Sequence, residues 1–90
     1  MSKEIIMFKN KTPLGRNNIC GENISKLRKE QTPKMSQRML ADKLQLFGID
    51  VDKNAIQRIE SGQRFVTDIE LLELAKIFNV TCDQLLQKQS

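Results

Sequence analysis

The stretch KNAIQRIESGQR, residues 53–64, decides how this sequence is interpreted. Its apolar residues Ala55, Ile56 and Ile59 fall on one side of a helical wheel, so the pattern predicts an amphipathic helix. We expect that helix to end at Gly62. The opposite side carries amides, a lysine and an arginine, whereas an ordinary solvated helix face is richer in glutamate and lysine. This composition raises the question of what the polar side binds.

The residue types on the polar side are suited to reading DNA bases. Asparagine and glutamine can pair bidentately with adenine, and arginine and lysine suit the acceptor atoms of guanine. A helix fits the major groove, where its N-terminal residues reach deepest. The side chains placed to do this are Lys53, Asn54, Gln57 and Arg58. A solvated helix face is the alternative interpretation of this segment taken alone.

The composition is that of one small helical domain with a basic side. Of the 90 residues, 39% are hydrophobic and 29% are charged, and the formal net charge is +4. The first two-thirds of the chain are basic and the last third is acidic, so we expect the basic side to face a polyanion. The chain has no histidine, and Cys20 and Cys82 form no spaced motif. We therefore expect free thiols, no metal site and no enzymatic activity.

Four further segments have the character of short helices, and together with the first they predict an all-α domain of five helices. These segments are residues 17–31, 36–48, 67–79 and 81–88. Residues 1–17 lack helical periodicity, and we expect a flexible basic arm there, followed by a helical domain over residues 18–90. The apolar run IIMF at residues 5–8 docks on a partner, pairs as a strand, or belongs to a disordered tail. It is too short for a signal peptide or a membrane span, so we expect a cytoplasmic protein.

Helix caps support these assignments. The expected N-caps are Asn17 or Asn18, Ser36, Asp52, Thr67 and Thr81. The last two belong to capping boxes completed by Glu70 and Gln84. In the fourth helix, the residues expected to face the core are Ile69, Leu72, Ala75 and Phe78.

Four ordered motifs resemble the phage-repressor and Cro type of helix-turn-helix domain. They are ISKLRKEQ (24–31), MSQRMLADKL (35–44), VDKNAIQRIESGQR (51–64) and LLELAKIFNVTCDQLL (71–86), and the resemblance covers roughly residues 19–87. It implies a five-helix phage-repressor-like DNA-binding domain whose third helix is the recognition helix. Two connections are longer than in the family. TPK (32–34) stands where the family has a single glycine, and LQLFGIDVD (44–52) replaces a compact turn.

The resemblance also implies roles for individual residues. The base-reading positions are matched by Lys53, Asn54, Gln57 and Arg58. Ser36 and Gln37 match the start of the second helix, where the family anchors a phosphate. Further phosphate contacts are expected from Lys34, Arg38 and Arg64.

Four of the matched positions have structural interpretations. Gln37 is alternatively a second capping residue, and Arg64 is alternatively a solvated loop arginine. Arg28 and Glu60 match an intramolecular ion pair that ties the first helix to the third in some relatives. We interpret this pair as structural, because loss of one partner would leave a partly buried charge unpaired.

Together these features predict a sequence-specific transcription regulator, and in particular a repressor, that binds double-stranded DNA. Because one recognition helix reads only a few base pairs, we expect a homodimer on a two-fold operator. The dimer surface is expected on the fifth helix and the end of the fourth, with exposed members of the set Ile77, Val80, Leu85 and Leu86. The alternative is a protein-interaction module of the same fold, an adaptor or antitoxin-type partner that uses the IIMF run. Neither function implies a cofactor or a membrane.

Overall fold

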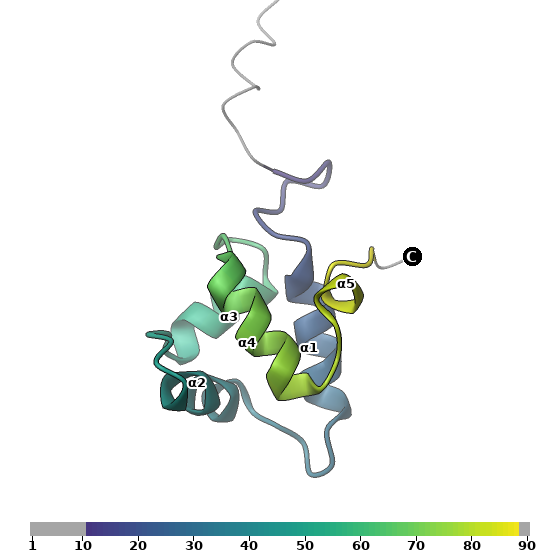
Figure 1. Cartoon of the computed structure of the whole chain (residues 1–90). Coiled ribbons are helices and arrows are strands. Elements are labelled where there is room, and N and C mark those ends of the chain that lie inside the picture. Colours follow the sequence, from purple (N-terminus) through teal and green to yellow (C-terminus); the bar gives the residue numbers. More distant parts are fainter. Residues whose placement is uncertain (1–10, 89–90) are drawn as a thin grey trace, which may run out of the picture.

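Five helices make up the part of the chain that the computed structural model describes, residues 11–88 (Figure 1). They are α1 (Cys20–Glu30), α2 (Gln37–Leu46), α3 (Lys53–Glu60), α4 (Asp68–Phe78) and α5 (Cys82–Leu85). These residues include no strand, and the predicted all-α fold of five helices is confirmed. The IIMF run lies outside the described residues.

Side-chain caps fix the start of α2, α3, α4 and α5, as the sequence predicts. The Ser36 Oγ accepts a hydrogen bond from the Met39 N–H at 3.0 Å. The Asp52 Oδ1 accepts one from the Ala55 N–H at 2.8 Å. The complete capping boxes are those of Thr67 with Glu70 and Thr81 with Gln84. Each cap occupies a donor at a helix end that the helix itself leaves unpaired.

The start of α1 differs from the prediction. Its N-cap is Ile19, which makes no side-chain cap bond, so the predicted position was too early. Asn18 supplies the capping bond from one position before, because its Oδ1 accepts a hydrogen bond from the Gly21 N–H at 2.8 Å. The amide nitrogen of the same side chain donates to the carbonyls of Ile59 and Arg64. Asn18 therefore connects the start of α1 to the end of α3 as well as capping α1.

The core lies between the helices, and each of them contributes to it. The side chains with the least exposure, at most 1%, are Ile24, Leu40, Leu44, Ile56, Ile59, Leu74 and Leu85. On α3 the buried residues Ala55, Ile56 and Ile59 are those that the helical wheel predicts. Burial of this side fixes the direction in which the opposite, polar side points.

α4 turns a different face to the core than the prediction gave. Ala75 and Phe78 are buried as expected, but Ile69 is 65% exposed and Leu72 is 48% exposed. The positions that pack inward are Leu71, Leu74, Ala75 and Phe78. They follow the i, i+3, i+4, i+7 pattern of one helix side. Because α4 has apolar residues on more than one side, its spacing alone does not select the buried one.

The lengthened connection between α2 and α3 carries its extra apolar residues on the surface. Leu46 is 84% exposed and Phe47 is 60% exposed, whereas Leu44 before them and Val51 after them are buried. Gly48 has a φ of +83°, the left-handed conformation that commonly follows a helix end. Leu46 and Phe47 therefore lie outside the core, and α3 still packs against α2.

Residues 12–16 form a turn that is attached to the loop after α3. The Thr12 N–H donates to the Arg16 carbonyl at 2.7 Å, and the Asn17 N–H donates to the Gly62 carbonyl at 2.8 Å. The amide of Asn17 also donates to the Gln63 carbonyl at 2.9 Å. The division into an arm over residues 1–17 and a domain over residues 18–90 stays a prediction, since residues 1–10 are outside the described range.

Candidate nucleic-acid interface

The polar side of α3 is exposed along the whole helix. It presents four exposed side chains, which we call the reading stripe: Lys53, Asn54, Gln57 and Arg58. Within residues 11–88, none of these four side chains takes part in a hydrogen bond or an ion pair. The structure thus brings the predicted base-reading residues together on one surface with their donors and acceptors unoccupied.

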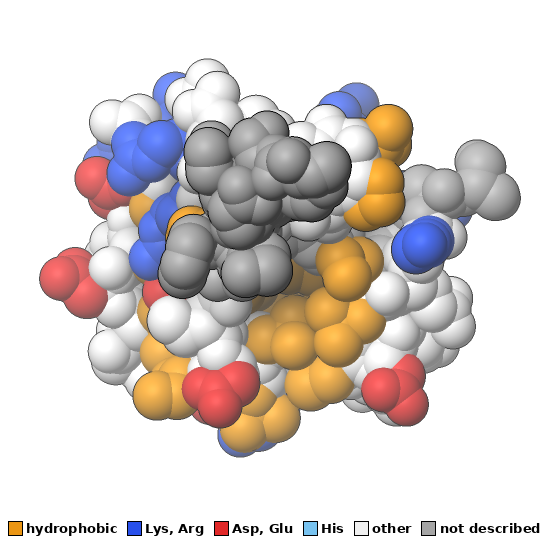
Figure 2. All heavy atoms as spheres, turned by 90° about the horizontal axis from the view of Figure 1, so that it is seen from above, with side chains coloured by type: hydrophobic (Ala, Val, Ile, Leu, Met, Phe, Trp, Pro, Cys, Tyr) orange, Lys and Arg blue, Asp and Glu red, His pale blue; other side chains and the backbone are white. Residues whose placement is uncertain are grey.

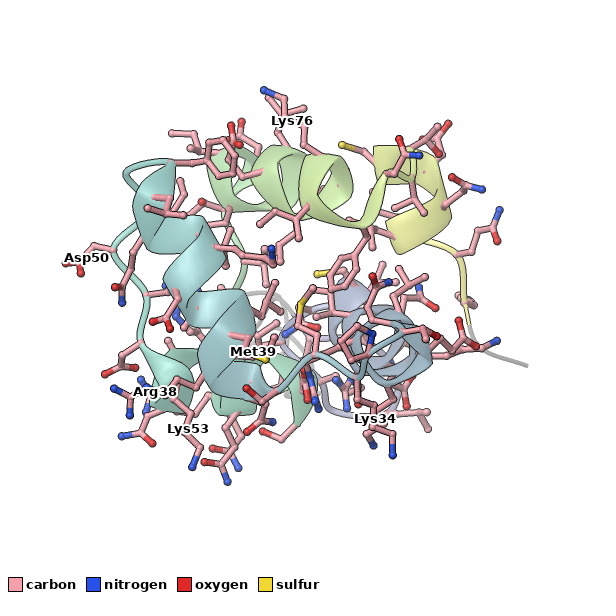
Figure 3. The ribbon with its side chains drawn as sticks, turned by 90° about the horizontal axis from the view of Figure 1, so that it is seen from below. Lys34, Arg38, Met39, Asp50, Lys53 and Lys76 are labelled. Atoms are coloured by element: carbon pink, nitrogen blue, oxygen red, sulfur yellow. The ribbon has the colours of Figure 1, made fainter. Side chains whose placement is uncertain are left out.

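Basic residues from other elements lie on the same side of the molecule as the reading stripe. Figure 3 shows Lys34 and Arg38 along the same edge as Lys53, and Lys76 at the opposite edge. Lys34 comes from the α1–α2 connection and Arg38 from the first turn of α2. Both are exposed, and the described residues offer neither side chain a hydrogen bond or ion pair. This edge therefore combines amide groups with positive charge.

Two acids lie among these basic residues. A recess of about 300 Å³ between α2 and α3 is lined by Arg38, Lys53, Asp42 and Asp52, among others. Carboxylates at this position repel an anion, and Asp52 is already engaged as the N-cap of α3. A phosphate inside the recess would therefore face two carboxylates as well as the two basic side chains.

The start of α2 holds the two residues that the resemblance assigns to phosphate. Ser36 is exposed and lies at the N-terminal end of α2, which is electropositive and suited to an anion. Gln37 is half-buried, and its Nε2 donates to the Glu60 Oε1 at 2.9 Å. Its side chain is therefore not a second cap of α2 but a link from α2 to α3.

An ion pair between α1 and α3 completes this link. The Arg28 Nε donates to the Glu60 Oε2 at 2.7 Å, and the Arg28 Nη2 donates to the Glu60 Oε1 at 2.9 Å. The two side chains are only 12% and 8% exposed. The Glu60 carboxylate raises the pKa of Arg28 above its ordinary value, chiefly through these hydrogen bonds. One carboxylate at the end of α3 thus contacts both α1 and α2.

Arg64, the remaining residue predicted to contact phosphate, is engaged within the fold. Its Nη1 and Nη2 donate to the two carboxylate oxygens of Glu70, each at 2.9 Å. Glu70 is buried, and the hydrogen bond from Arg64 is the main cause that lowers its pKa. Arg64 is thus not a solvated loop arginine, and a phosphate would have to share its guanidinium with Glu70.

A polar clamp, which the sequence alone does not predict, lies behind the end of α3. The buried Asn18 side chain donates to the carbonyls of Ile59 and Arg64 at 2.9 and 2.7 Å. The Arg16 Nη2 donates to the Glu60 carbonyl at 2.8 Å. Gly21 permits this contact, because a Cβ there would collide with the Ile59 carbonyl. A glycine inside a predicted helix is the sequence signal of such a close approach.

Other chemistry has few possible sites in this part of the chain. Among the described residues no group of His, Cys, Asp or Glu could hold a metal ion. Cys20 and Cys82 are free, and burial raises the pKa of the Cys20 thiol to about 11. None of the described helices has both the length and the apolar character needed to cross a membrane.

Comparison with known proteins gives one match. The family model described as helix-turn-helix matches residues 24–85, a range that runs from within α1 to the last residue of α5. This range contains the reading stripe, the start of α2 and the ion pair between Arg28 and Glu60. No curated protein and no solved structure matches the chain.

Proposed function

The chain belongs to the helix-turn-helix family, and we propose that it regulates transcription by binding double-stranded DNA in a sequence-specific way. The observation that carries this proposal is the reading stripe. It is a run of amide and basic side chains on an exposed helix, with no partner among the described residues. Side chains of this kind can enter a groove without the loss of an intramolecular hydrogen bond.

We propose that α3 lies in the major groove and that its N-terminal residues reach the bases. Asn54 and Gln57 match the donor and acceptor pattern of adenine, while Lys53 and Arg58 suit guanine or a nearby phosphate. The phosphate contacts come from Lys34, Arg38 and the start of α2 at Ser36 and Gln37, with Arg64 as a further candidate. The Glu60 network supports this arrangement because it joins α1, α2 and α3 at one point.

We also propose that the protein acts in the cytoplasm as a dimeric repressor. A dimer doubles the number of base pairs read and places two recognition helices about one turn of DNA apart. Of the apolar residues expected at the dimer surface, Leu86 is 42% exposed and Ile77 and Val80 are partly buried. Leu85 is 0% exposed and belongs to the core, so it is not a candidate.

The test is the salt dependence of binding to a mixed-sequence duplex and to a selected one. A DNA-binding protein loses affinity steeply as salt rises, with a log–log slope of about −0.9 for each neutralised phosphate. Replacement of Lys34 by alanine should reduce the magnitude of this slope by about 1 on both duplexes. Lys76→Ala, at the opposite edge of the molecule, is the matched control and should change neither slope nor affinity (Figure 3).

Base reading is tested separately with Asn54→Ala and Gln57→Ala. Each should lower the preference for the selected duplex by roughly 1–3 kcal/mol and leave binding to mixed DNA nearly unchanged. Equal losses on both duplexes would contradict a base-reading role for α3. Salt-independent or absent DNA binding by the unmodified chain would favour the adaptor alternative.

A further inference from the structure

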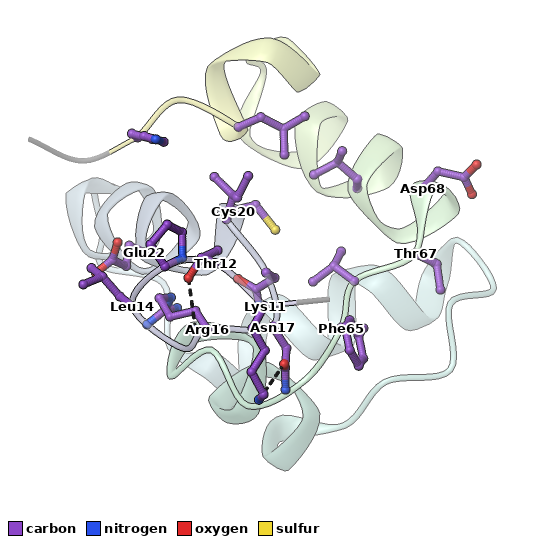
Figure 4. Close-up of a pocket in the computed structure, with 17 residues that line it drawn as sticks. Lys11, Thr12, Leu14, Arg16, Asn17, Cys20, Glu22, Phe65, Thr67 and Asp68 are labelled. Carbon is purple, nitrogen blue, oxygen red and sulfur yellow. Dashed lines mark hydrogen bonds between the residues drawn. The ribbon is translucent and has the colours of Figure 1, made fainter. Parts of the chain in front are cut away.

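A large apolar pocket lies on the face of the molecule seen from above (Figure 2). Its volume is about 790 Å³, and it lies between the N-terminal turn, the start of α1, the segment before α4 and the end of α5. Figure 4 shows Leu14 and Phe65 on either side of it with Cys20 between them. Its main apolar lining residues are Leu14, Ile19, Cys20, Phe65, Leu71 and Leu86. We call this pocket the N-terminal groove.

Three large apolar side chains at the N-terminal groove are exposed to water. Leu14 is 87% exposed, Phe65 is 54% exposed and Ile19 is 42% exposed. Burial of these side chains against another apolar group would be favourable, because it removes apolar surface from water. No residue of α2 or α3 lines it, so the groove is separate from the reading stripe.

The first residues that the structure describes lie at the groove, and an apolar run precedes them in the sequence. Lys11, Thr12 and Pro13 line the groove. Residue 11 is held there, since its Nζ donates to the Asn17 Oδ1 at 2.9 Å (Figure 4). The run IIMF, residues 5–8, precedes Lys11 by only three positions and is flanked by polar residues on both sides. At roughly 3.5 Å per residue, a connection of three residues spans at most about 10 Å and one of six residues at most about 21 Å, so the run is short enough to reach the groove.

We propose that residues 5–8 dock into the N-terminal groove of their own chain. Four consecutive apolar side chains match a groove that offers them Leu14, Phe65 and Leu71, and burial of each one removes apolar surface from water. The short connection gives the segment a high effective concentration at its own groove, which favours it over a second copy or a foreign peptide. Docking would also fasten the turn that carries Arg16 to the end of α3.

The test uses a tryptophan reporter in the full chain. The sequence contains no tryptophan and no tyrosine, so Phe8→Trp gives one fluorophore whose emission reports the surroundings of residue 8. We expect its emission at shorter wavelength in the folded protein than in urea, and independent of protein concentration. Addition of Leu14→Ser in the groove should move the emission towards that of the unfolded chain. Leu46→Ser is the matched control, because Leu46 is 84% exposed at the end of α2, away from the groove, and its replacement should leave the emission unchanged.

Two outcomes would overturn the proposal. If Phe8→Trp and a second reporter, Ile6→Trp, both emit at the unfolded wavelength while circular dichroism shows folded helices, then the segment does not dock. If the emission shift grows with protein concentration, then the groove binds the segment of another copy. Both readouts are independent of DNA, so they separate this proposal from the proposed function.

Discussion

Replacing Glu60 with alanine should cost far more stability than replacing an exposed acid. The Glu60 carboxylate accepts two hydrogen bonds from Arg28, at 2.7 and 2.9 Å, and one from Gln37 at 2.9 Å. Since the Arg28 and Glu60 side chains are only 12% and 8% exposed, water cannot readily replace the hydrogen bonds that the variant removes. Breaking such a pair costs about 3–5 kcal/mol. We expect about 3 kcal/mol, the lower end of this range, because Arg28 keeps its hydrogen bond to the Met35 carbonyl.

Urea denaturation followed by circular dichroism measures this loss, and thermal unfolding should show it as a fall in Tm of roughly 12–24 °C. Asp42→Ala is the control, because Asp42 is an exposed acid on α2 with no hydrogen bond or ion pair to the described residues. It should change the free energy of unfolding by no more than about 0.5 kcal/mol. Equal free energies of unfolding for Glu60→Ala and Asp42→Ala would refute the reasoning.

A double variant tests whether the two charges act as a pair. Arg28→Met combined with Glu60→Leu removes both charges and fills the space with apolar groups, so part of the lost stability should return. If the losses of the two single variants simply add in the double variant, then Arg28 and Glu60 are not coupled.

Two other changes in stability are expected from contacts behind α3. Gly62→Ala should destabilise the fold more than Gly48→Ala. Both glycines have a φ of +83°, but only at Gly62 would an added Cβ meet another side chain, the Arg16 Cζ at 2.7 Å. Equal losses of Tm in the two variants would contradict this contact. The pKa of Glu70 in the folded protein is below its unfolded value of about 4.3. The stability that its carboxylate contributes is therefore fully present above that pH and is lost as the pH falls through the folded pKa. Arg64→Met should therefore lose less stability than the unmodified chain on acidification through this range, as measured by urea denaturation, and parallel losses would exclude the pair as the cause.

The parts of the fold that the sequence predicts well depend on local rules. The wheel of α3 identifies the buried Ala55, Ile56 and Ile59, because polar residues occupy all its other positions. The caps Ser36 and Asp52 act within their own helices, so their hydrogen bonds need no tertiary information. The helix count and order follow from these same signals and from the family resemblance.

The parts that the sequence does not predict depend on contacts between distant residues. Asn18 bonds to carbonyls more than 40 positions away, and no local pattern encodes that partner. The bidentate pair of Arg64 with Glu70 forms only once the loop before α4 has its final course. In α4, apolar residues on several sides leave the choice of buried face to tertiary packing, which is why Ile69 and Leu72 were assigned to the wrong side.

The central claim is that the reading stripe on α3 recognises a DNA sequence, and selection of bound duplexes from a random pool tests it most directly. We expect an enriched consensus arranged as an inverted repeat, with half-sites about 10 base pairs apart or a multiple of that distance. Repetition with Asn54→Ala and Gln57→Ala should weaken the consensus at the positions those side chains read. No enrichment over the starting pool at low salt would contradict the claim.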